Sequence, residues 1–356
     1  MKNRAVPGKF LWILPLLLST LACRAATRLI IPDTPTPLPP TATVTASPTL
    51  PPTATATPIF EAACPSLLTD VMIAATRDDG DSEAPLTIKP RGHDEDIYYL
   101  VNYSLKADKL ANREELFVPD DFENELDRRA THELIWDYFA ALIPVEERNF
   151  VTEFSAMSDG RSRILGAVSR TFDNPAKWSL RVDVVDASDH YSLTYTLMHE
   201  FGHLLTLKPS QVAVDKGIFF NPENEDLYDR AVAACQPRYF ADDGCSASNS
   251  YINEFFNRYW SGIYSEWQEI DKEKGERSYS SSLHDFYETY SDQFVKEYAA
   301  TSPEEDIAES WAFFVLAPKP EATSIANEKT VFFYEYPELV SLRQEILTRL
   351  CVNFPQ

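Results

Sequence analysis

Five consecutive residues, His199-Glu200-Phe201-Gly202-His203, constrain this chain more than any other segment, because they form an HExxH motif within a strongly helical stretch. Residues four apart lie on one face of a helix, so both imidazoles can reach a single metal ion. Glu200 then stands beside the open coordination position, as in a catalytic zinc site with a glutamate general base. The alternative is a pair of histidines that only pack within a helix interface.

The segments around the motif predict how its helix begins and what lies beside it. Ser192 is expected to cap the helix, and Pro209 follows its end. Just before it, 178–184 alternates apolar and polar side chains, which favours a half-exposed strand at a sheet edge. An extended peptide would add to such an edge through main-chain hydrogen bonds. Further strands are predicted at 97–105, 149–154 and 164–171, and further helices at 127–142 and 338–350.

Two histidines leave a zinc ion short of protein ligands, and the residues just after His203 offer no other. The best source of a third ligand is a second helix, about one hundred residues further on. Ser302 as its cap and Pro303 at its first position predict where it starts. The helix is apolar on two sides, which indicates burial, yet it carries Glu305 and Glu309 on one face.

Carboxylates on a buried face need a strong partner, because an unpaired buried charge is costly. We therefore predict that Glu305 binds the metal and that Glu309 lies behind it and orients a ligand histidine. A capping box with Ser302 is the alternative role for Glu305, although it leaves Glu309 unexplained. Glu304 and Asp306 are the alternative ligands on the same helix.

HEFGH followed by ExxxE on a later helix resembles the gluzincin-type metallopeptidases, among them the catalytic domain of anthrax lethal factor. The chain also resembles secreted bacterial zinc peptidases that share an EDxAE second motif. The resemblance covers residues 178–317 and implies a zincin-like fold. It also implies a Zn²⁺ ion bound by His199, His203 and Glu305, with Glu309 in support.

The same family has a catalytic tyrosine seven residues before the ligand glutamate, a place that Tyr298 takes here. The resemblance implies that its phenol donates a hydrogen bond to the oxyanion. With Glu200 as the base, these residues predict a zinc-dependent endopeptidase that acts on a protein or peptide substrate through an activated water. A catalytically silent zincin-fold surface binding module is one alternative, and a zinc amidase acting on cell-wall peptides is the other.

The N-terminus predicts export. Residues 1–22 combine a basic start, a short apolar run and a small-residue exit, which is typical of a signal peptide and too short for a membrane span. Cys23 stands where a bacterial lipoprotein is cleaved and acylated, although Thr20 makes the lipobox imperfect. Plain cleavage near Ala22 is the alternative. We expect a cell-surface lipoprotein or an extracellular protein of a bacterial-type envelope, in contact with a membrane only through this anchor.

The remaining chain divides into a tether and one folded domain. Residues 23–60 are rich in Pro and Thr and cannot bury a core, which is typical of an extended tether. Residues 61–356 are long enough for one large α+β domain. We expect a mixed sheet, the HExxH helix and the second ligand helix in this zincin-like metallopeptidase domain, with a helical insertion at about 210–290.

The cysteines and the net charge limit the other classes of site and partner. An even number of cysteines behind an export signal predicts disulfides, and we favour Cys235–Cys245 and Cys64–Cys351. A Cys-rich metal site is the alternative, but no CxxC spacing supports it. The formal net charge of −23, without a basic cluster, argues against nucleic acid as a partner.

Overall fold

The computed structural model describes residues 97–118, 126, 128–159, 165–185, 187, 189–241, 243–274 and 276–352. The signal peptide, the tether and the lipid anchor predicted from the sequence lie outside these residues. Cys64, the expected disulfide partner of Cys351, also lies outside them. In the described part of the chain, none of the helices has both the length and the apolar character of a membrane span.

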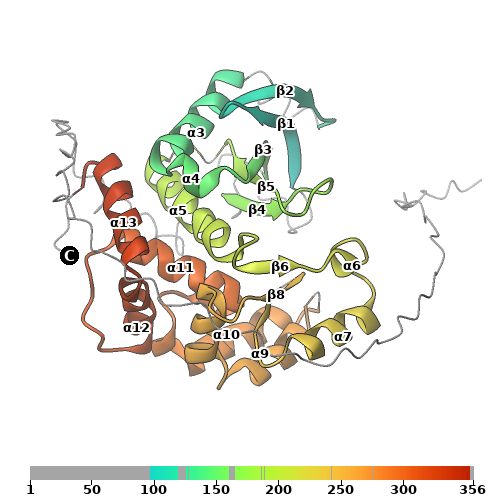
Figure 1. Cartoon of the computed structure of the whole chain (residues 1–356), viewed down its shortest axis with the longest axis vertical. Coiled ribbons are helices and arrows are strands. Elements are labelled where there is room, and N and C mark those ends of the chain that lie inside the picture. Colours follow the sequence, from blue (N-terminus) through green and yellow to red (C-terminus); the bar gives the residue numbers. More distant parts are fainter. Residues whose placement is uncertain are drawn as a thin grey trace, which may run out of the picture. The chain divides into compact units, whose positions relative to one another are not determined.

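The predicted α+β class and mixed sheet are confirmed (Figure 1). The central sheet has five strands in the order β2-β1-β3-β5-β4. Strands β3 and β5 run parallel, and the other neighbouring pairs run antiparallel. The strands are β1 (Tyr98–Lys106), β2 (Lys109–Glu115), β3 (Val151–Ser158), β4 (Gly166–Arg170) and β5 (Trp178–Asp183).

The sheet edge next to the HExxH helix is β4, so the prediction that 178–184 forms an edge strand is wrong. Strand β5 lies between β3 and β4 and pairs with both. Its alternation arises because its polar side chains find partners across the sheet: the Arg181 guanidinium donates to Tyr99 Oη at 3.0 Å and to Ser169 Oγ. The alternation in β5 therefore reflects polar side chains with partners on neighbouring strands. The edge strand is β4, which lies next to β5 in the sheet.

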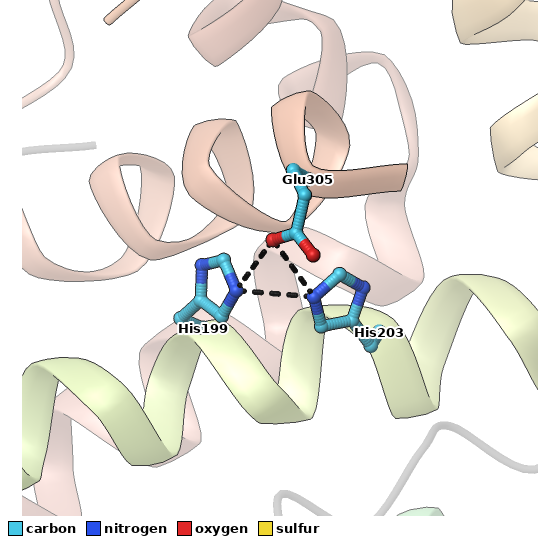
Figure 2. A group of neighbouring side chains, drawn as sticks. All are labelled: His199, His203 and Glu305. Carbon is cyan, nitrogen blue, oxygen red and sulfur yellow. Dashed lines mark hydrogen bonds and ion pairs between the residues drawn. The ribbon is translucent and has the colours of Figure 1, made fainter. Parts of the chain in front are cut away.

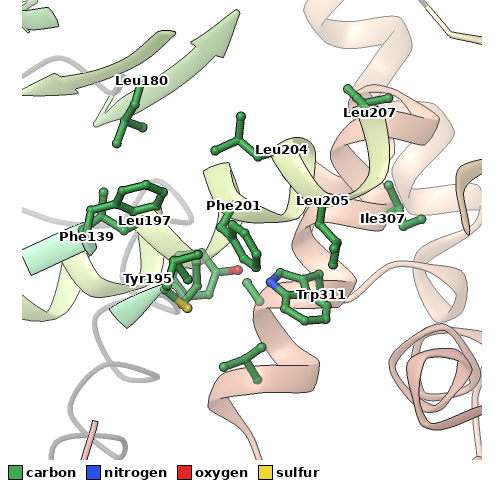
Figure 3. Packing of buried hydrophobic residues seen from close by; sticks show 14 of the residues in the cluster. Phe139, Leu180, Tyr195, Leu197, Phe201, Leu204, Leu205, Leu207, Ile307 and Trp311 are labelled. Atoms are coloured by element: carbon green, nitrogen blue, oxygen red, sulfur yellow. The ribbon is translucent and has the colours of Figure 1, made fainter. Parts of the chain in front are cut away.

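Helix α5 (His190–Leu207) carries the HExxH motif and lies between the sheet and helix α11 (Pro303–Leu316), as Figure 3 shows. It is buried on all sides from Leu193 onward, which is the pattern of a core helix. Asp189 caps it in place of the predicted Ser192, because its carboxylate accepts the backbone N–H groups of Tyr191 and Ser192. Leu197, Phe201 and Leu204 are each fully buried.

The segment 210–290 is mainly helical and also forms a small three-stranded antiparallel sheet. A disulfide joins Cys235, at the end of α7, to Cys245 in β8. Its elements are β6 (Val212–Val214), α6 (Lys216–Phe219), α7 (Glu225–Cys235), β7 (Phe240–Ala241), β8 (Gly244–Ser246), α8 (Tyr251–Phe255), the π-helix η3 (Phe256–Trp260), α9 (Tyr264–Asp271) and α10 (Tyr279–Thr289).

Helix α11 begins as predicted, with Pro303 in its first turn and the Ser302 hydroxyl accepting the Glu305 backbone N–H at 3.1 Å. Nearly all of its residues are buried. The other elements are α3 (Arg129–Leu142) and α4 (Val145–Arg148) beside the sheet, and η4 (Ser291–Gln293), η5 (Glu297–Thr301), α12 (Ile325–Phe332), η6 (Phe333–Glu335) and α13 (Pro337–Arg349) on either side of α11 in sequence.

A fully buried ion pair ties α11 to α12 and to the segment 210–290. Lys329 Nζ lies 2.5 Å from Asp306 Oδ2, and both side chains have no exposed surface. Trp260 Nε1–H donates to the same carboxylate at 2.7 Å, and the Phe294 ring lies 4.3 Å from the ammonium. Burial raises the pKa of Asp306 to about 6 despite Lys329. Loss of either side chain would therefore leave the other one buried without an oppositely charged partner.

Replacement of Lys329 by Met is expected to lower the free energy of unfolding by about 3–5 kcal/mol, because it leaves Asp306 buried without its cation. The matched control is Lys272→Met, which breaks an ion pair with Glu269 whose side chains are 67% and 72% exposed and which should cost under about 1 kcal/mol. Urea unfolding of the three proteins measures both values. Equal losses in the two variants would contradict the structural role of the buried pair.

Candidate metal centre

Three predicted ligands, His199, His203 and Glu305, converge on one point (Figure 2). Two come from successive turns of α5, and the third comes from the first turn of α11. His199 Nε2 lies 3.0 Å from Glu305 Oε2, and His203 Nε2 lies 3.3 Å from the same oxygen. The two Nε2 atoms are 3.0 Å apart. The donor atoms thus form a nearly equilateral triangle.

The triangle has the size that a tetrahedral zinc ion requires. Zinc–nitrogen and zinc–oxygen bonds of about 2.0–2.1 Å place neighbouring ligand atoms roughly 3.3 Å apart. Glu305 Oε2 is buried and accepts no hydrogen bond from the described residues, although both imidazoles face it. A buried oxygen of this kind needs a partner, and a metal ion at the centre of the triangle would supply one. The donor set therefore fits a metal ion.

The charges of these side chains support one another. Burial would raise the pKa of Glu305, but the His203 and His199 rings outweigh it and hold the pKa well below its usual range. Burial would likewise lower the pKa of His199, but the carboxylates of Glu309 and Glu305 outweigh it and raise the pKa. The carboxylate of the third ligand is therefore ionised, whereas a metal ion would have to displace a proton from His199.

Glu309 lies behind the triangle, one turn after Glu305 on α11. Its Oε1 atom is 3.1 Å from His199 Nδ1, the nitrogen that faces away from the other ligands. The Tyr195 hydroxyl donates to Oε2, and Lys296 Nζ lies 3.2 Å from Oε1. A carboxylate on the far nitrogen of a ligand histidine sets its tautomer and its orientation. The position of Glu309 corresponds to the supporting role inferred from the sequence.

Glu200 is buried, with 5% of its surface exposed, and faces the edge strand β4. A Cβ atom on Gly166 would lie 3.1 Å from Glu200 Cγ and 2.7 Å from Thr196 Cγ2. Glycine at this position thus lets the strand pass close to the carboxylate. Burial raises the pKa of Glu200 above its ordinary value.

Tyr298 lies in η5, and its ring centroid is 5.9 Å from that of His199. Desolvation of the hydroxyl, followed by the charges of Glu305 and Glu200, raises the pKa of Tyr298. About half of the residue, 49%, is open to solvent. The phenol is therefore protonated at neutral pH and available as a hydrogen-bond donor.

The alternative ligands on α11 are held elsewhere. The Tyr239 hydroxyl donates to Glu304 Oε1 at 2.7 Å, and Asp306 belongs to the buried pair with Lys329. The capping-box alternative for Glu305 is half present, because the Ser302 cap is made while the Glu305 carboxylate points to the imidazoles. The structure thus separates three adjacent acids into three environments.

A cleft of about 880 Å³ opens over the triangle. Strand β4 forms one side along its full length, Gly166–Arg170, and the segment 210–290 forms the other with Tyr239, Tyr264 and Trp267 among its residues. Glu200 and Tyr298 also line it. The insertion seen in the sequence is therefore part of the cleft wall. Phe255, Tyr259 and Trp260 of the same segment are buried in the core, and Phe256 is half-buried against it.

Two residues at the centre escaped the sequence analysis. Tyr195 lies four positions before His199, on the same face of α5, so helical spacing alone would have placed it beside the ligands. Lys296 lies outside any regular helix or strand and has no comparable signal in the sequence.

Comparison of the chain with models of protein families, with curated proteins and with solved structures gave no match. The case for a function therefore comes from the residues and geometry of this centre.

The distance between the two ligand helices depends on Gly202, inside the HExxH motif. A Cβ atom there would lie 2.9 Å from the Ala308 Cα atom and 3.1 Å from its carbonyl oxygen. Backbone atoms cannot move aside as a flexible side chain can, so any larger residue would push α5 and α11 apart. The separation of the helices sets how far Glu305 stands from the imidazoles.

Gly202→Ala is expected to lower the free energy of unfolding by about 1–3 kcal/mol and to weaken metal binding, because it moves Glu305 away from the histidines. Gly262→Ala is the matched control: apart from the adjacent residues, no atom of the described chain lies within 4 Å of a Cβ placed there, and the change should stay within about 0.5 kcal/mol. Urea unfolding and zinc titration give both quantities. Unchanged zinc affinity in Gly202→Ala would show that helix spacing does not control the centre.

Proposed function

We propose that the protein is a zinc-dependent endopeptidase. The observation that carries the proposal is the convergence of His199, His203 and Glu305 on one point, with Glu200 beside it, at the floor of an open cleft. Zinc is the metal of choice because two imidazoles and one carboxylate at tetrahedral spacing form a typical catalytic zinc set. Three protein ligands leave one position for a substrate or water.

The chemistry divides among the groups around the cleft. A bound zinc ion supplies Lewis-acid polarisation of a substrate carbonyl and lowers the pKa of water. Glu200 takes a proton from the attacking water and passes it to the leaving amine. Tyr298 donates a hydrogen bond to the carbonyl oxygen as negative charge develops there. Glu309 holds the His199 ring in the orientation that directs Nε2 to the metal.

The edge strand beside the centre supports an extended peptide as the substrate. Among the described strands, β4 pairs only with β5, and it lines the cleft with Gly166–Arg170. A peptide that adds to this edge is fixed by main-chain hydrogen bonds, which places a peptide bond rather than a particular side chain over the metal. Gly166 keeps the strand close to Glu200.

Glu200→Gln is expected to bind one zinc per chain, as the wild type does, and to lose activity by a factor of about 10²–10⁴, because the amide cannot accept the proton. Zinc analysis and a mixed peptide library read by mass spectrometry test both points. Zinc in both proteins without cleavage would favour the binding module or an amidase, and cell-wall peptides would then be assayed. Absence of zinc in the wild type would refute the proposal.

Tyr298→Phe is expected to lower kcat by a factor of about 10²–10³, with little change in KM or zinc content, because it removes one donor to the oxyanion. Tyr228→Phe is the matched control, since it removes a phenol from another part of the same cleft and should leave kcat unchanged. Steady-state kinetics on one peptide substrate measures the difference. A similar fall in both variants would argue against a specific role for Tyr298.

We further propose, from the sequence alone, that the protein is exported and anchored through an acylated Cys23. The Pro/Thr-rich residues 23–60 would then act as an extended tether that holds the catalytic domain away from the membrane surface. Mass spectrometry of the N-terminal peptide would detect the acyl group and would distinguish it from plain cleavage near Ala22.

A further inference from the structure

Lys296 occupies a position between the ligand network and the proposed oxyanion donor. Its side chain is 9% exposed, and its ammonium lies 3.2 Å from Glu309 Oε1. The same ammonium is 4.7 Å from the Tyr195 ring centroid and 5.9 Å from that of Tyr298. Both distances fall within the range of cation–π attraction. One cation therefore contacts the carboxylate behind His199 and the two tyrosines beside it.

The backbone at Lys296 explains this placement. The residue is extended, with φ −161° and ψ 170°, and immediately precedes η5. Lys296 and Tyr298 both turn toward the metal centre, whereas Glu297 between them is half exposed and pairs with His284 at the surface. Lys296 and Tyr298 are only two residues apart at the start of η5, so one short piece of chain makes the contacts of both.

We propose that Lys296 is a positioning residue that couples the orientation of His199 to that of Tyr298. This inference rests on the proposed function and extends it to a residue that is neither a candidate metal ligand nor part of the cleft lining. Glu309 has a side chain only 2% exposed, and a buried carboxylate keeps a fixed charge and direction only with a cation and donors around it. Lys296 is the cation, and Tyr195 is a donor.

The consequence for the ligand is a defined orientation. Glu309 Oε1 lies 3.1 Å from His199 Nδ1, and on the other side of the ring Nε2 faces Glu305 at 3.0 Å. Loss of the ammonium leaves Glu309 buried without this cation. The carboxylate then fixes the orientation of the His199 ring less firmly. The second contact of the ammonium keeps the Tyr298 ring over the same site.

The test compares Lys296→Met, Lys296→Arg and a control, Lys208→Met, in the full chain. Lys208 follows the same helix α5 and pairs with Glu147 at 2.9 Å, away from the metal centre. We expect the zinc dissociation constant, measured by chelator competition, to rise by about 10- to 100-fold in Lys296→Met. Lys296→Arg should restore most of the affinity, and Lys208→Met should match the wild type. Urea unfolding of the zinc-free proteins identifies any variant that fails to fold.

A second measurement tests the link to Tyr298. At saturating zinc, Lys296→Met should still show a reduced kcat with little change in KM, and the same substitution in a Tyr298→Phe background should reduce kcat no further. Wild-type zinc affinity in Lys296→Met, or additive losses of kcat in the double variant, would overturn the proposal while leaving the peptidase intact. Wild-type protein that binds no zinc would instead refute both.

Discussion

The close contact between α5 and α11 is the constraint on which the rest of the structure depends. Gly202 allows the two backbones to meet at Ala308, and this contact brings a glutamate from one helix to two histidines of the other. The sheet on one side of α5 and α11 on the other bury the helix from Leu193 onward. Ligands on two packed helices are held as rigidly as the close-packed core around them, whereas loops would hold them less rigidly.

Burial of so much charge in one place is possible because each carboxylate of α11 has its own partner. Glu304 accepts from the Tyr239 hydroxyl, Glu305 faces the imidazoles, Asp306 meets Lys329, and Glu309 meets Lys296 and Tyr195. A helix places successive acids about 100° apart, so neighbours in sequence enter different surroundings. The acidic residues of α11 thus have two roles. Asp306 anchors the helix within the fold, while Glu305 and Glu309 face the metal centre.

Much of this centre could be predicted from the sequence because its signals are local. The HExxH spacing, the Ser302 cap and the two acids on one helical face all follow from the period of a helix. The edge strand was misassigned because alternation cannot distinguish exposure to solvent from pairing with Tyr99 and Ser169 across the sheet. Lys296 was missed because only tertiary packing brings it to Glu309.

The segment 210–290 connects the two ligand helices and also forms one side of the cleft over the metal centre. Its aromatic residues pack into the core, and Trp260 donates to Asp306, one residue after the ligand Glu305. On its other side, Tyr239 and Trp267 line the cleft that opens over the metal centre. The same segment therefore fixes α11 and shapes the space for a substrate. Substitutions in the segment 210–290 would therefore alter both the substrate specificity of the cleft and the position of the third ligand, Glu305.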